Sequence, residues 1–150
     1  MLSSEQWLLL GNDFCRLYSA CKHAIQISQT RYSKSHGFAK NIYGLGIDIV
    51  KLQSLLDGIV NNQYPGESSA DVLPGTDIRL TQLFYRSNLY PQGTLLERIK
   101  PFPDNLTAEQ QNFIYQFLSD FRTFIVRVGN LTHINMTKME RSLDNIANFI

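Results

Sequence analysis

Residues 38–60, FAKNIYGLGIDIVKLQSLLDGIV, carry the most regular pattern in the chain. Their apolar side chains recur at alternating intervals of four and three, at Phe38, Ile42, Leu45, Ile49, Leu52, Leu56 and Ile59. This spacing puts one side chain per turn on a single face of an α-helix, as in the seam of a coiled coil. The stretch therefore predicts a helix over residues 38–61, with Leu45, Ile49, Leu52 and Leu56 buried against the preceding helix. Gly44 and Gly46 lie on this helix and are interpreted as positions of close packing.

Four further segments show helical periodicity. Ser3 and Gln6 form a capping-box pattern that opens a helix over residues 4–33, and a turn at 34–37 folds the next helix back onto it. Thr107 and Gln110 repeat the pattern before a helix over 107–128, for which Gly129-Asn130 is the predicted C-terminal cap. Weaker patterns predict helices over 77–90 and 137–150, and the Pro- and Gly-containing residues 61–75 predict a loop. The predicted fold is all-α, an antiparallel four- or five-helix bundle forming one domain over residues 1–150.

Composition excludes several classes of protein. The 150 residues are 43% hydrophobic and 18% charged, which is typical of a packed globular domain and not of a disordered chain. The net charge is +1 with no basic run, so there is no strong signal for nucleic-acid binding. No apolar stretch approaches the roughly twenty residues that span a bilayer, and no signal peptide is present. Together with two cysteines whose spacing does not suit a disulfide, this predicts a cytoplasmic protein without membrane insertion.

The usual sequence signatures of chemistry are missing. Gly44-Leu45-Gly46 lacks the third glycine and the preceding strand of a phosphate-binding loop. No paired cysteines or closely spaced histidines suggest a metal site, and His23 has no acidic residue four positions away. Cys15 and Cys21 fall on a packed helix, where a thiol behaves as a small apolar group. The sequence therefore predicts no cofactor and no metal.

One short motif indicates a possible enzymatic function. The stretch from Arg127 to His133, RVGNLTH, resembles the Arg-x4–6-His motif of the all-helical nucleases of the HEPN superfamily. The resemblance implies RNA cleavage with Arg127 and His133 as the catalytic pair, at a cleft between two subunits. It covers seven residues, and Arg31 with His36 and Arg16 with His23 have permitted spacings too. The family usually has a polar residue after the Arg, where this chain has Val128.

We therefore expect a non-enzymatic interaction or regulatory module that binds a protein partner or itself. The alternatives are the HEPN-like RNase and a bundle with a pocket for a small apolar ligand. Phe113, Phe117, Phe121 and Phe124 are expected to form core rather than a ligand site, because their spacing places them on one helical face. Candidate interface anchors are five side chains of types that are enriched at binding hot spots, namely Tyr64, Tyr85, Arg86, Tyr90 and Tyr115.

Overall fold

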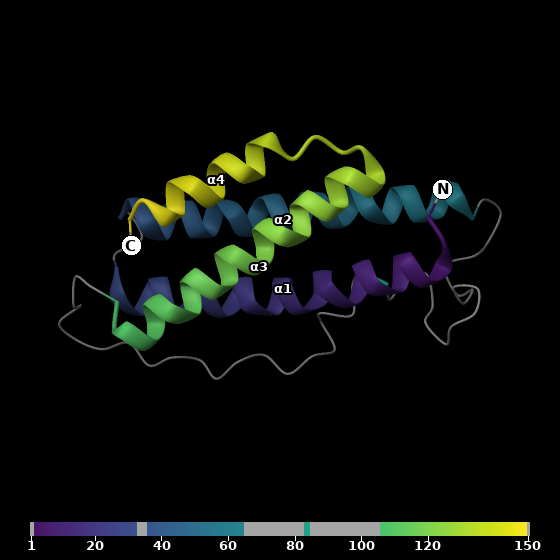
Figure 1. The fold of residues 1–150 in the computed structure, drawn as a ribbon. Coiled ribbons are helices and arrows are strands. Elements are labelled where there is room, and N and C mark those ends of the chain that lie inside the picture. Colours follow the sequence, from purple (N-terminus) through teal and green to yellow (C-terminus); the bar gives the residue numbers. More distant parts are fainter. Residues whose placement is uncertain (1, 33–35, 65–82, 85–105, 150) are drawn as a thin grey trace.

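The computed structural model describes residues 2–32, 36–64, 83–84 and 106–149, and four helices make up most of these ranges (Figure 1). No strand occurs within them. The predicted all-α class is therefore confirmed for the described part of the chain. None of the described helices has an apolar window long enough to cross a bilayer.

Helix α1 spans Ser4–Arg31 and begins with the predicted capping box. The Gln6 backbone N–H donates to the Ser3 hydroxyl at 3.1 Å, and the Ser3 N–H donates to the Gln6 side-chain oxygen at 2.9 Å. These two bonds satisfy donors that a helix start leaves free. The helix ends at Arg31, two residues before the predicted end.

Helix α2 spans Gly37–Gln63 and contains the regular pattern at 38–60. Its N-terminal cap is His36, whose Nδ1 accepts a hydrogen bond from the Phe38 N–H at 3.1 Å. The seam residues from Phe38 to Leu56 are buried as predicted, whereas Ile59 is half-buried and Val60 is buried in its place. Residues 62 and 63, predicted as loop, belong to the helix, whose C-terminal cap is Tyr64.

Helix α3 spans Ala108–Thr132 and has the predicted cap at Thr107. Its predicted end at Gly129-Asn130 is wrong. The helix continues for one more turn because His133, with φ of 63°, adopts the left-handed conformation and donates its N–H to the Gly129 carbonyl at 3.0 Å. Helix α4 spans Thr137–Ala147, short of the predicted end at 150, and residues 148–149 form a turn.

The helix predicted over 77–90 falls almost entirely outside the described residues, as do residues 65–75 of the predicted loop. Leu83 and Phe84 are described, and they form a fully buried turn. The Gln53 amide of α2 donates to the Phe84 carbonyl at 2.8 Å. The Phe84 ring packs edge-to-face on Phe14 of α1, with centroids 5.8 Å apart. This turn is therefore anchored on both α1 and α2.

The four helices surround one apolar core. Helix α1 packs on α2 and α3, and α4 packs on α2 and α3, so the order around the core is α1, α2, α4, α3. Figure 1 shows α1 and α2 side by side, with α3 crossing them obliquely. At one end, the Trp7 indole N–H of α1 donates to the Gln63 side-chain oxygen of α2 at 2.8 Å.

Candidate binding surface

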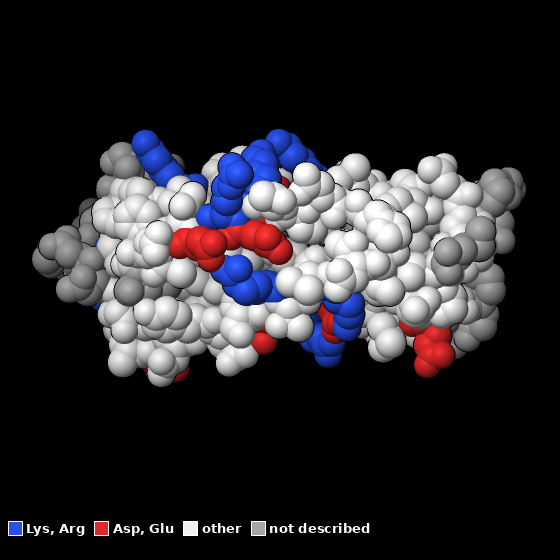
Figure 2. Space-filling model, turned by 45° about the horizontal axis from the view of Figure 1, so that its top comes forward, with Lys and Arg blue, Asp and Glu red and all other residues white. Residues whose placement is uncertain are grey.

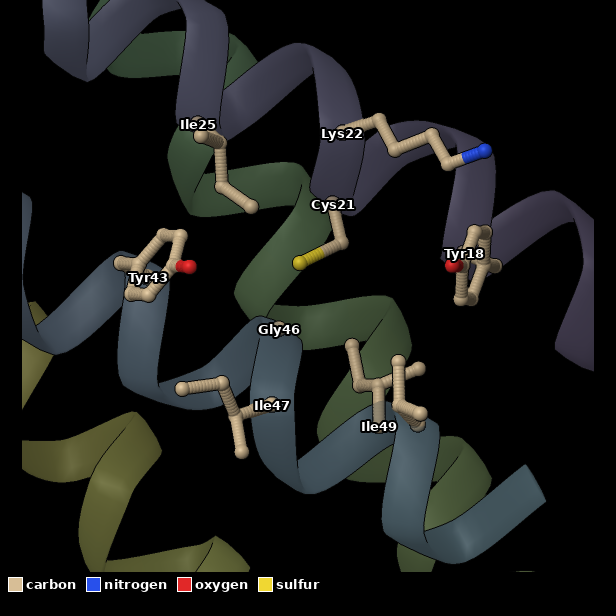
Figure 3. Close-up of a pocket in the computed structure, with 9 residues that line it drawn as sticks. Tyr18, Cys21, Lys22, Ile25, Tyr43, Gly46, Ile47 and Ile49 are labelled. Atoms are coloured by element: carbon tan, nitrogen blue, oxygen red, sulfur yellow. The ribbon is translucent and has the colours of Figure 1, made fainter. Parts of the chain in front are cut away.

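A shallow apolar groove runs between α1 and α2 (Figure 3). Its volume is about 190 Å³. Cys21 and Ile49 lie at its base and are buried, while Tyr18 and Ile25 are half-buried. Gly46 brings the two helices close together, because a Cβ atom there would lie 3.1 Å from Ile25 Cδ1. The predicted packing role is thus confirmed for Gly46, but Gly44 faces open space.

An exposed apolar ridge on α2 borders this groove. Tyr43, Ile47 and Val50 are 59%, 46% and 45% exposed, yet they line the groove. Their spacing of four and three repeats that of the buried seam on an adjacent strip of the same helix. Single exposed apolar side chains are ordinary, whereas a contiguous apolar patch beside a groove is a candidate binding surface. We call these three residues the α2 ridge.

Among the described residues that line this groove, Lys22 is the only charged one. Its ammonium lies over the ring of Tyr18, 4.5 Å from the ring centroid. A cation over an aromatic face is attracted by the ring quadrupole, by about 0.5 to 1 kcal/mol at an exposed site. This contact holds a positive charge at the α1 edge of an otherwise apolar surface.

A second groove, between α2 and α4, lies on the other side of the ridge. Ile47 lines both grooves, and Lys40, Lys51 and Lys138 contribute three ammonium groups to the second. Asp48 is the only acidic residue in the described part of its lining, and the Asp48 carboxylate lies 3.7 Å from the Lys138 ammonium. The α2 ridge is therefore flanked by cations on both sides.

A third groove, between α1 and α3, is electrostatically balanced. Its charged residues are Asp13, Asp120, Arg16 and Arg127, and both arginines pair with Asp13. Figure 2 shows basic and acidic side chains lying next to one another on one face of the molecule, mostly in its left half. Exposed ion pairs of this kind contribute little stability, about 0 to 1 kcal/mol each. No excess charge on this groove favours an ionic ligand.

Arg127 and His133, the candidate catalytic pair, lie on α3 and at its C-terminal cap. The Arg127 guanidinium bonds to Asp13 of α1, and His133 is exposed in its left-handed cap position. Six helical steps rotate one residue about 240° from the other, so the two side chains leave the helix in different directions. Within one chain the described contacts do not join this pair.

The other two histidines have structural partners. His23 packs edge-to-face on Phe113 with centroids 4.7 Å apart. His36 caps α2 and stacks on Tyr32 at 4.3 Å. His23 and His36 are the histidines of the other two Arg/His spacings, and in the structure they make packing and capping contacts.

Both cysteine side chains, Cys15 and Cys21, are buried. Burial raises the pKa of the Cys21 thiol to about 12, so this thiol is protonated at neutral pH. Cys15 lies 3.9 Å from the Leu83 carbonyl oxygen, within reach of a weak thiol hydrogen bond. Among the described residues no three His, Cys, Asp or Glu side chains converge as a metal site would require.

The aromatic candidates divide between core and surface. Phe117, Phe121 and Phe124 are buried, which confirms that they form core, whereas Phe113 is half-buried and packs against it. Tyr115 is 48% exposed on α3, whereas Tyr64 packs against the core. Tyr85, Arg86 and Tyr90 lie outside the described residues. The α2 ridge was not predicted from the sequence, although its spacing of four and three residues beside the seam indicates a second apolar strip on the same helix.

No protein-family model, curated protein or solved structure matches the chain. Function is therefore argued from the surface itself.

Proposed function

We propose that this chain is a non-enzymatic interaction module, an antiparallel helical bundle of four or five helices that binds a protein partner through the face formed by α1 and α2. The observation that carries the proposal is the α2 ridge, three large apolar side chains about half exposed beside a groove. Because its two cysteines are buried thiols, the module is proposed to work in the reducing cytoplasm.

The energy available from the ridge suits a reversible partner. Full burial of a large apolar side chain contributes about 1.5 to 3 kcal/mol. Since roughly half of each ridge side chain is already covered, a partner that covers the rest gains about 2 to 4 kcal/mol from these three residues. Contacts in the adjoining grooves add to this gain.

The size of the groove favours side chains of a protein over a small ligand. Pockets for drug-sized ligands enclose about 300 to 1,000 Å³ and cover most of the ligand. The α1–α2 groove encloses about 190 Å³ and is open along the ridge. It accommodates one or two apolar side chains of a docked helix rather than an enclosed small molecule.

A matched pair of variants tests the proposal. Ile47→Asp places a charge in the ridge, and Val126→Asp makes the same charge change at an equally exposed β-branched residue on α3, 47% against 46%. Proteins that co-purify with the wild type are identified, and their affinity is then measured with purified components by calorimetry. We expect Ile47→Asp to weaken the complex at least about tenfold, as for a residue at the centre of an interface, and Val126→Asp to leave it unchanged. Equal affinity for both variants would contradict the proposal.

A further inference from the structure

Resting on the function proposed above, we propose that the partner segment is an acidic amphipathic helix. Its apolar stripe lies along the α2 ridge, and its carboxylates reach the lysines on either side. The proposal rests on one arrangement of side chains. An apolar ridge with helical spacing lies between two grooves whose charged residues are nearly all positive.

The charge of this face differs from that of the whole chain. The two grooves contain Lys22, Lys40, Lys51 and Lys138, four of the six lysines in the sequence, and one acidic residue, Asp48. Four positive charges and one negative charge give +3, whereas the whole chain has a net charge of +1. The remainder of the chain is thus −2, so positive charge is concentrated on the proposed docking face. An acidic partner matches it.

The positions of the lysines determine where the partner helix is expected to have acidic residues. Lys22 is held at the α1 side of the ridge by Tyr18. Lys40 and Lys51 lie on the α4 side, and within the described residues neither has an ion-pair partner. A helix about 10 Å wide laid along the ridge reaches both sides. Its apolar residues at intervals of four and three are therefore expected to have acidic residues on both flanks.

A second copy of this chain fits the same face poorly. In a two-fold symmetric pair the same patch meets itself, so the +3 face would oppose another +3 face. Like charges brought together across an interface cost several kcal/mol. A partner helix whose apolar stripe is flanked by acidic residues avoids this repulsion.

An anionic membrane would also meet an apolar surface with flanking lysines. The groove between α1 and α2, with a volume of about 190 Å³, favours a partner with protruding side chains over a flat lipid surface. Tyr43, Ile47 and Val50 have the spacing that packs against the apolar stripe of another helix, so they favour a helix over a lipid surface.

The test uses the full chain and two designed helical peptides with the same leucine stripe, one flanked by Glu and the other by Lys. We expect the Glu peptide to bind at least about tenfold more tightly than the Lys peptide at low salt, and the difference to shrink at high salt. The double variant Lys40→Glu/Lys51→Glu should reverse this preference. Arg16→Glu, a single charge reversal of the same kind in the α1–α3 groove, should leave it unaltered.

The outcomes separate the two proposals. If both peptides bind equally and Ile47→Asp abolishes both, docking on the ridge stands and the acidic partner is wrong. If neither peptide binds, or if both bind equally well to Ile47→Asp, docking on the ridge is wrong as well. Binding of the wild type to phosphatidylserine vesicles, lost in the double lysine variant and unmatched by either peptide, would overturn the helix in favour of a membrane.

Discussion

Alanine is expected to stabilise the protein at Gly44 and to destabilise it at Gly11, although both glycines lie inside helices. At Gly44 a Cβ atom would meet nothing within 4 Å, so the substitution gains the difference in helix propensity, about 1 kcal/mol. At Gly11 a Cβ atom would lie 2.6 Å from the Leu83 carbonyl oxygen and 2.8 Å from its Cδ1. Overpacking costs about 1 to 3 kcal/mol, which exceeds or cancels the propensity gain and leaves a net loss of up to about 2 kcal/mol.

Thermal unfolding followed by circular dichroism measures both effects. For a chain of this length about 1 kcal/mol corresponds to about 2 to 4 °C in Tm, so Gly44→Ala should melt higher and Gly11→Ala at or below the wild type. Gly58→Ala is the matched control, since a Cβ atom there also meets nothing within 4 Å. If Gly11→Ala were as stabilising as Gly44→Ala, the turn at Leu83 and Phe84 would not lie on α1, and the reasoning would be refuted.

Three other predictions concern the core, the candidate RNase pair and a buried thiol. Leu52→Ala should lower the free energy of unfolding by about 2 to 5 kcal/mol in urea titrations, because Leu52 is buried in the seam; a loss below about 0.5 kcal/mol would show that the seam is not packed. His133→Gly should raise stability by up to about 1 kcal/mol at its left-handed cap and leave RNA degradation at the background of a mock purification; wild-type activity that the variant lacks would instead establish the RNase. Because burial raises the pKa of Cys21 from 9.0 in the unfolded chain to about 12, its protonated form contributes stability that is complete below pH 9 and is lost as pH rises toward 12. Cys21→Ala should therefore show a shallower fall in unfolding free energy over that range, and an identical fall would contradict the burial.

The sequence predicted those features that depend on local chemistry. Ser3 and Thr107 were identified as helix starts because a capping box uses residues only three positions apart. The seam at Leu45 and Ile49 was identified because burial on one helical face repeats along the chain. These patterns need no knowledge of distant segments.

Features that depend on tertiary contacts were harder to predict. Gly129 has the usual character of a helix terminus, but α3 continues past it and ends where His133 takes a left-handed conformation that glycine more often adopts. The ridge at Ile47 resembled one more apolar strip of a buried helix, because sequence periodicity does not reveal which strips the other helices cover. Lys138 of α4 belongs to the same face only because α4 packs on α2, and the sequence alone does not show this packing.

The most direct test of the account is a map of amide chemical shifts in the full chain, recorded as the Glu-flanked peptide is added. The account predicts that the largest changes fall on residues 18–25 of α1 and 43–51 of α2, around Gly46, and that Ile47→Asp removes them. Changes concentrated on residues 117–127 of α3, or no saturable change at any residue, would contradict the central claim that the α1–α2 face is the binding surface.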